Sequence, residues 1–171
     1  MKEAYLISAK RTATGKANKG SLRFTRPETL GGEVIKDLLS ENPALDPAQV
    51  DDVILGCAFP EASQGLNMAR QVAHLGGLPH TVPGMIVNRF CSSGLQSIAL
   101  ASERIMTGGA DVIIAGGVEH MSMVPMGGMS VQPHPGLVND YPEMYISMGL
   151  TAENVADKYT VSREDQDEFA F

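Results

Sequence analysis

Cys91 is the side chain of this protein best suited to covalent chemistry, because a cysteine thiolate is a strong nucleophile. It lies in the stretch VNRFCSSGLQSIAL, residues 87–100, between a short apolar run and a segment with helical spacing. If residues 84–88 form a strand and a helix begins near Ser93, Cys91 occupies the turn from strand to helix. Free amide groups and the positive end of the helix dipole favour a thiolate there. The small residues that follow would let a substrate approach the backbone, as in the nucleophile elbow of hydrolases.

Packing is the alternative role for Cys91, because a cysteine beside Phe90 and small residues can also fill a core. The spacing alone leaves both roles open. Cys57, the other cysteine, follows an apolar run in LGCAFP, and we expect it to be a buried core residue. Since no secretory signal is recognised, both thiols are expected to be free in a reducing compartment, with the cytoplasm as the expected location.

The residues around Cys91 need a scaffold, and the sequence predicts an α/β domain. Short apolar runs rich in strand formers predict buried strands at residues 4–8, 53–57, 84–88 and 111–117. Helical spacing predicts connecting helices over residues 27–43, 67–77 and 93–109. Strands without alternation, separated by helices, are typical of a mostly parallel sheet that is covered on both faces. The predicted order is β-α-β-α-β-α-β, in an α/β domain of residues 1–118.

Residues 119–171 differ in composition and are expected to form a separate region. Residues 121–149 are rich in Met, Pro and Gly and have no clear period, which is typical of a long functional loop or a small subdomain. Two short helices are expected next, one capped by Thr151 and one by Ser162, with Asp165 completing a capping box. Because the last segment is too short for a stable isolated helix, we expect the sequence to be the front part of something longer.

Composition and charge favour a small-molecule partner over a nucleic acid or a membrane. The 171 residues are 43% hydrophobic and 19% charged, with a formal net charge of −7 and no basic cluster. No apolar run approaches the ~18 residues of a membrane span. Neither a metal nor a dinucleotide is expected, since no G-x-G-x-x-G follows a strand and metal-site spacing is absent among His74, His80, His120 and His134. Glu119, after an apolar strand, is expected to be buried and hydrogen-bonded in a structural role.

The segment VNRFCSSGLQSIALASERIMTGGADVIIAGGVEHMSMVPM, residues 87–126, resembles the active-cysteine segment of the thiolase family. The segments SAKRTATGK, VILGCAFPEASQGLNMARQ and MGLTAENVADKYTVSREDQDEFA are similar to segments in the same order in that family. The resemblance is closest to the degradative 3-ketoacyl-CoA thiolases. The family fold is a five-layer αβαβα sandwich of two similar halves. The resemblance therefore implies a thiolase-like first half, with part of the inserted loop domain in residues 119–171.

The resemblance also implies a thiolase-type acyltransferase in which Cys91 is the acyl-thioester nucleophile. Such an enzyme cleaves a 3-ketoacyl-CoA to acetyl-CoA and a shortened acyl-CoA, or runs the reverse condensation, with coenzyme A as co-substrate and no permanently bound cofactor. Met148 is implied as a substrate-binding residue, because its Ser-Met-Gly tract stands where biosynthetic relatives have His-Met-Gly. The missing histidine argues against a strictly acetoacetyl-specific enzyme. Since relatives pair through the third strand, here Met85–Asn88, a homo-oligomer is implied, either a dimer or a tetramer.

Three motifs that the family places in its second half are absent from this sequence: Asn-Glu-Ala-Phe, Gly-His-Pro and Cys-x-Gly. His134 precedes a proline, but Pro133 stands where the motif requires glycine. We therefore expect a truncated or split thiolase whose second half another chain supplies, and which exposes apolar surface without it.

Three other functions stay open at this stage. One is a biosynthetic acetyl-CoA C-acetyltransferase, and another is a non-catalytic thiolase-like fragment that binds acyl-CoA or a partner chain. A ketoacyl synthase, the third, has a similar Cys-Ser-Ser run on the same fold. The segments GGVEHMSMVPM and TAENVA count against the ketoacyl synthase.

Overall fold

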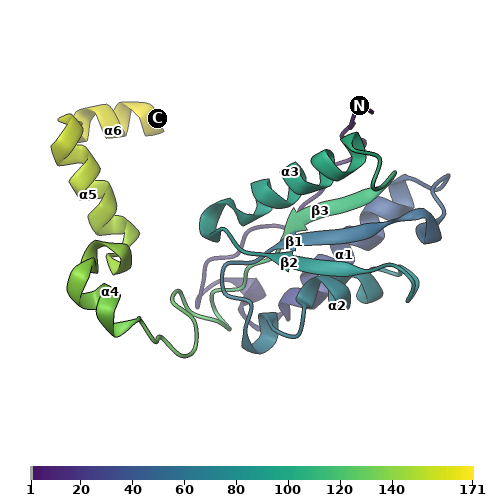
Figure 1. Ribbon diagram of the computed structural model, residues 1–171, viewed down its shortest axis with the longest axis horizontal. Helices are drawn as coiled ribbons and strands as arrows, with labels where there is room; N and C mark the ends of the chain where they lie inside the picture. The colour runs from purple at the N-terminus through teal and green to yellow at the C-terminus, as the bar shows by residue number, and fades with distance from the viewer. Residues whose placement is uncertain (1) are drawn as a thin grey trace. The chain divides into compact units, whose positions relative to one another are not determined.

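Three parallel strands form the central sheet (Figure 1). The computed structural model describes residues 2–171 of the chain. In sequence order the strands are β1 (Asp52–Gly56), β2 (Gly84–Val87) and β3 (Ile113–Gly117). β1 lies between the other two, with Ile54 opposite Met85 and Ala115. Because strands flank β1 on both sides and helices cover both faces, all five of its residues are buried, which explains its continuous apolar run.

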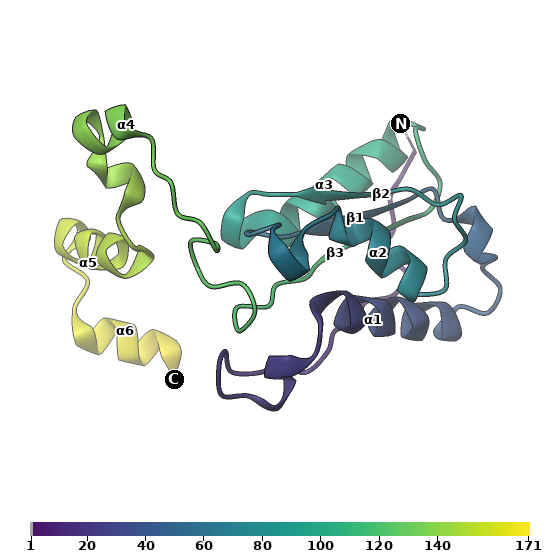
Figure 2. The same ribbon diagram turned by 90° about the horizontal axis from the view of Figure 1, so that it is seen from below.

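Helices cover both faces of the sheet (Figure 2). One face carries α3 (Ser93–Met106), and the other carries α1 (Pro27–Glu41) and α2 (Met68–Leu75). Side chains of β1 alternate between the two faces, so that Val53 and Leu55 join the core cluster with Val72 of α2. Complete burial of a valine such as Val72 contributes about 1.5–3 kcal/mol. The sheet therefore has a well-packed core beneath α1 and α2.

The three predicted connecting helices are confirmed by α1, α2 and α3. The predicted strands at residues 53–57, 84–88 and 111–117 are confirmed by β1, β2 and β3, with ends that differ by one or two residues. Their predicted burial holds for β1 but is wrong for β2 and β3, whose residues are all at least partly exposed because each lies at an edge of the sheet. A single-turn 3-10 helix precedes α1 at Ser21–Phe24, and three more lie between the later elements, at Pro47–Gln49, Ala62–Gln64 and Phe90–Ser92. None of the helices within residues 2–171 combines the length and the apolar character needed to cross a membrane.

The strand predicted at residues 4–8 is wrong. This segment has no regular secondary structure, and Tyr5, Leu6 and Ile7 are 71%, 81% and 79% exposed. Its composition favours a strand, but a strand exists only where a neighbour completes the hydrogen-bond ladder. The element order of the α/β domain is therefore α-β-α-β-α-β.

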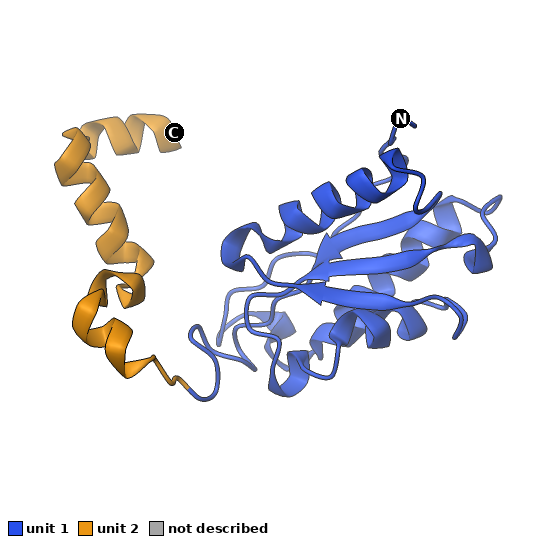
Figure 3. Ribbon diagram, viewed as in Figure 1, with its two compact units in different colours: residues 1–130 blue, residues 131–171 orange. Residues whose placement is uncertain are grey.

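The chain divides into two compact units, Met1–Ser130 and Val131–Phe171 (Figure 3). The second unit contains α4 (Pro135–Asp140), a 3-10 helix (Pro142–Tyr145), α5 (Met148–Tyr159) and α6 (Arg163–Ala170). Every residue from 131 to 171 is at least partly exposed. Burial of apolar surface is the main stabilising term in folding, and the second unit contains no buried residue. Helix capping therefore contributes a larger part of the stability of its helices than it does in the first unit.

Caps fix the starts of the last two helices. Ser162 and Asp165 form the predicted capping box, in which the Asp165 amide donates to Ser162 Oγ over 3.0 Å. The predicted cap at Thr151 is wrong, because Ser147 caps α5 by accepting from the Leu150 amide over 3.3 Å. Serine and threonine are both good caps, and the earlier one gives the longer helix. Thr151 therefore lies inside the first turn, where its hydroxyl donates to the Ser147 carbonyl.

Candidate active site

Cys91 lies in the 3-10 turn Phe90–Ser92, between the end of β2 and the start of α3. This is the strand-to-helix turn that the sequence predicts. The side chain is exposed and the thiol is free, so Cys91 is not a core residue. An exposed thiol one residue before the N-cap of a 14-residue helix lies where amide groups and the helix dipole favour an anion. The position suits a nucleophile that attacks an electrophile arriving from solvent.

Serine hydroxyls fix the backbone on both sides of Cys91. Ser93 Oγ accepts from the Arg89 amide over 2.8 Å and donates to the Phe90 carbonyl over 2.6 Å. Ser92 Oγ donates to the Arg89 carbonyl over 2.9 Å. Both hydroxyls are therefore engaged with the backbone of the turn. The Ser-Ser pair after the cysteine explains how a short polar turn keeps a defined shape at the surface.

Phe90 adopts a left-handed backbone conformation directly before Cys91, with φ of 46°. Such a conformation costs a residue with a bulky side chain about 1–3 kcal/mol, which surrounding contacts must offset. One such contact is to Phe59, whose ring centroid lies 6.1 Å from that of Phe90. The strained residue turns the chain sharply between β2 and α3, as in strand-turn-helix elbows that expose a nucleophile.

Close packing places the start of α3 directly on the strand ends. A Cβ atom at Gly56, the last residue of β1, would lie 2.4 Å from the carbonyl carbon of Ser93. Only glycine fits such an approach without a shift of the backbone. Ser97 Oγ donates to the Gly116 carbonyl of β3 over 2.7 Å, which ties the second turn of α3 to the sheet. The helix that follows Cys91 is thus fixed against both β1 and β3.

Cys57 follows β1 and is 1% exposed, within the core cluster. The prediction that it packs in the core is confirmed. Burial, with a smaller contribution from the nearby Glu119 carboxylate, raises the pKa of the Cys57 thiol to about 11. The Cys57 thiol is therefore protonated at neutral pH and unreactive. Only one of the two cysteines has a setting that suits nucleophilic chemistry.

Glu119, just after β3, organises a polar cluster at the ends of β1 and β3. Its carboxylate accepts from the Ala58 amide over 2.6 Å and from Gln64 Nε2 over 2.7 Å. Gln64 is completely buried and also donates to the Phe59 carbonyl over 2.8 Å. The predicted hydrogen bonding of Glu119 is confirmed, but its predicted burial is wrong, because Glu119 is exposed at the strand ends. Sequence reasoning did not identify Gln64, because its partners are distant along the chain.

Of the four histidines, His74, His80 and His134 are exposed and His120 is buried. His120 is buried, with Nε2 lying 3.0 Å from the Leu22 carbonyl and Nδ1 accepting from the Met123 amide over 3.3 Å. His134 is exposed and caps α4 by accepting from two backbone amides. Residues 2–171 contain no group of three or more His, Cys, Asp or Glu side chains that could hold a metal ion.

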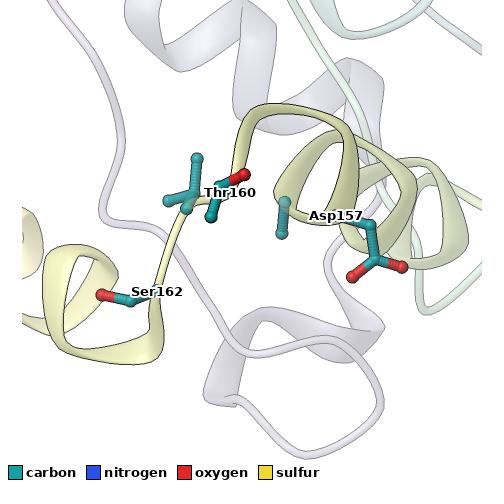
Figure 4. A pocket seen from close by; sticks show the side chains of 5 residues that line it. Asp157, Thr160 and Ser162 are labelled. Carbon is teal, nitrogen blue, oxygen red and sulfur yellow. The ribbon is translucent and has the colours of Figure 1, made fainter.

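Met148, the predicted substrate-binding residue, is the first residue of α5 and is 63% exposed. It lines an open hollow of about 460 Å³ in the second unit, together with Val155, Val161 and Gln166 among others. A smaller hollow of about 250 Å³ lies at the turn between α5 and α6, beside Asp157, Thr160 and Ser162 (Figure 4). Met148 and Cys91 belong to different units. The role of Met148 therefore stays a prediction.

The first unit is thus an α/β domain with an exposed cysteine at a strand-to-helix turn. Residues 4–171 match the family model described as "Thiolase, N-terminal domain". Because the match covers nearly the whole chain, this protein belongs to the thiolase family. Its α/β core and parallel sheet agree with a thiolase-like half-domain.

Curated relatives support the same assignment. The chain is 56% identical to a 3-ketoacyl-CoA thiolase of Bacillus subtilis (strain 168) over 170 residues, which are 99% of this chain and 43% of the relative. It is 43% identical to a 3-ketoacyl-CoA thiolase of Pseudoalteromonas translucida over all 171 residues, 44% of that relative. A protein of the same name from Shewanella sp. (strain MR-7) is 45% identical over 99% of this chain. The chain spans less than half the length of the curated relatives it matches.

Proposed function

We propose that Cys91 is the acyl-accepting nucleophile of a 3-ketoacyl-CoA thiolase. The observation that carries the proposal is an exposed thiol at the N-terminus of α3, in a chain of the thiolase family. The shared name of the relatives supports the substrate class. The opposite state of Cys57, buried with a raised pKa, leaves Cys91 as the thiol with access to a substrate.

The proposed reaction has two steps. The Cys91 thiolate attacks C3 of the 3-ketoacyl-CoA, the C2–C3 bond breaks, and its electron pair leaves with C2. The resulting enolate takes up the proton that the thiol released, and acetyl-CoA departs. The thiol of coenzyme A then attacks the acyl thioester, and its proton passes to the leaving Cys91 sulfur. The products are acetyl-CoA and a shortened acyl-CoA, with coenzyme A as co-substrate and no permanently bound cofactor.

This reaction needs groups beyond the nucleophile, namely a base for the thiol and a donor that stabilises the enolate. The hydroxyls next to Cys91 are unsuited to both tasks, because Ser92 and Ser93 donate to the backbone of their own turn. We assign the base and the enolate donor to a second half of the enzyme, in the same polypeptide or in a partner chain. Of these three catalytic groups, the first unit supplies only the nucleophile, Cys91.

Substrate binding and assembly are further parts of the proposal. Met148 would contact the substrate, and its exposed, adaptable thioether beside an open hollow supports that role. β2 is an edge strand of the sheet, with Met85 37% exposed. An edge strand has unpaired backbone groups on one side, which supports pairing between two copies in a homo-oligomer. We propose a cytoplasmic enzyme of fatty acid β-oxidation that catalyses this cleavage or the reverse condensation.

Intact-mass spectrometry tests the proposed chemistry. The chain is mixed with acetoacetyl-CoA, and separately with a longer 3-ketoacyl-CoA, in the absence of free coenzyme A. We expect one acyl group per chain, of the length that remains after loss of acetyl-CoA, and its removal when coenzyme A is added. The adduct should form slowly, over hours, because the base and the enolate donor are assigned to the second half of the enzyme. Acylation by acetyl-CoA and acetoacetyl-CoA alone would favour the biosynthetic acetyltransferase. Binding of acyl-CoA without any adduct would favour the non-catalytic alternative.

A further inference from the structure

The left-handed Phe90 is held in place by the side chain of Asn88, two residues earlier. Asn88 Oδ1 accepts from the Phe90 amide over 2.9 Å. Its Nδ2 donates to the Ala58 carbonyl over 2.9 Å. Because one partner is a donor and the other an acceptor, only one orientation of the Asn88 amide satisfies both bonds. Asn88 therefore links the turn before Cys91 to the loop that follows β1.

That loop is itself fixed by a carboxylate from a third strand end. The Ala58 amide donates to Glu119 Oε2 over 2.6 Å, and Gln64 Nε2 donates to Glu119 Oε1 over 2.7 Å. The next residue, Phe59, packs its ring against Phe90. Two contacts therefore connect this loop to Phe90. Ala58 is linked to it by hydrogen bonds through Asn88, and Phe59 contacts its ring directly. The contacts form a continuous chain from Glu119 to the residue before Cys91.

We propose that Asn88 is a positioning residue that keeps Phe90 left-handed and so places the Cys91 thiol at the start of α3. Glu119 supports this arrangement by accepting the hydrogen bond of the Ala58 amide. The inference rests on the proposed function of Cys91 for its catalytic consequence. Its structural part, control of the Phe90 backbone, is measurable without any substrate. A small displacement of the Cys91 thiol should strongly lower the rate of acylation by a bound substrate. The rate of alkylation by a general thiol reagent should change little, because such a reagent needs no fixed orientation.

Three variants of the whole chain separate the contacts. Asn88→Ala removes both hydrogen bonds. Asn88→Asp keeps an acceptor for the Phe90 amide but places an oxygen where Ala58 requires a donor. Phe90→Gly adopts positive φ without steric cost, so the turn depends less on Asn88. Asn42→Ala is the matched control, because it removes an asparagine bond to the Leu38 carbonyl at the end of α1, away from the turn.

The first measurement is NMR of the Phe90 backbone, whose chemical shifts and coupling constants report the sign of φ. In Asn88→Ala we expect φ to become negative and the Phe90 amide to lose its protection from hydrogen exchange. Asn42→Ala should leave both unchanged. A positive φ and a protected amide in Asn88→Ala would overturn the proposal. These readouts remain decisive if the unmodified chain forms no acyl adduct, an outcome that counts against the proposed function alone.

The second measurement is the rate at which acetoacetyl-CoA acylates Cys91, followed by mass spectrometry. We expect Asn88→Ala to slow acylation by about tenfold or more, with Asn88→Asp in between. In the Phe90→Gly background the same alanine change should slow it by less than about threefold. Iodoacetamide labelling of Cys91 should change less than acylation in every variant. Equal losses in both backgrounds, or equal losses in acylation and labelling, would show a merely structural role.

Discussion

The turns that follow β1 and β2 begin at the same edge of the sheet but place their cysteines in opposite settings. Cys57 comes directly after β1, is 1% exposed, and has a raised pKa. Cys91 comes four residues after the end of β2, and it is exposed at the start of α3. The carboxyl edge of a parallel sheet gathers residues suited to chemistry. The residues after each strand decide which of them can react.

The largest expected effect comes from replacing the two cysteines one at a time. Cys91→Ser should abolish the covalent adduct formed with a 3-ketoacyl-CoA, because no other accessible thiolate replaces it. Cys57→Ala should keep the adduct, since Cys57 takes no part. Intact-mass spectrometry of both variants checks the result. An adduct that survives in Cys91→Ser and disappears in Cys57→Ala would reverse the roles assigned to the two turns.

Thiol labelling compares the same two residues without a substrate. In the native chain iodoacetamide should modify Cys91 about 1000-fold faster than Cys57, because Cys57 reacts only after the core opens. In urea that unfolds the chain, the two rates should become equal within a few fold. Peptide mapping of the labelled protein measures both rates at once. Similar native rates would mean that the loop after β1 opens freely.

Two glycines test how the start of α3 is fixed. Gly56→Ala should destabilise the protein by about 3 kcal/mol, because its Cβ would lie 2.4 Å from the Ser93 carbonyl carbon. Gly94→Ala is the matched control, since no atom lies within 4 Å of a Cβ there, and alanine in a helix should add about 0.5–1 kcal/mol. Urea denaturation measures both. Equal effects would contradict the close contact between β1 and α3.

The smallest expected effect is a pH dependence of the free energy of unfolding that the Cys57 thiol causes. The pKa of its thiol is raised from 9.0 to about 11 in the native state, so between these values the unfolded state loses the proton first. Stability is therefore fully present below pH 9 and falls as the pH rises toward 11, by about 2 kcal/mol. Comparing urea denaturation of the unmodified protein and Cys57→Ala at pH 8 and pH 10.5 isolates this contribution. Parallel pH profiles for the two proteins would rule it out.

Local patterns were sufficient to predict most of the fold around Cys91. Apolar runs predicted β1, β2 and β3, and helical spacing predicted the helices between them, because both signals come from residues close together in sequence. The turn that contains Cys91 followed from its place between a predicted strand and a predicted helix. The segment at residues 4–8 was mispredicted, since the strand pattern carries no information about whether a pairing neighbour exists.

The contacts that shape the site were beyond sequence reasoning, because they join residues far apart in the chain. Gln64 meets Glu119 across 55 positions, and Asn88 meets Ala58 across 30. A weak signal existed for Asn88, a polar residue that ends a short apolar run. The sequence places both Ser147 and Thr151 before helical residues, and both residue types cap helices, so the pattern alone did not show that Ser147 caps α5.

The most direct test of the central claim is tandem mass spectrometry of the peptide that contains Cys91, after the chain has reacted with a 3-ketoacyl-CoA. The account predicts the shortened acyl group on the Cys91 sulfur, and an unmodified Cys57 in the same sample. Acyl groups spread over lysines and serines, or found on Cys57, would contradict it. A chain that binds the acyl-CoA yet shows no acylated peptide at any pH would contradict it equally.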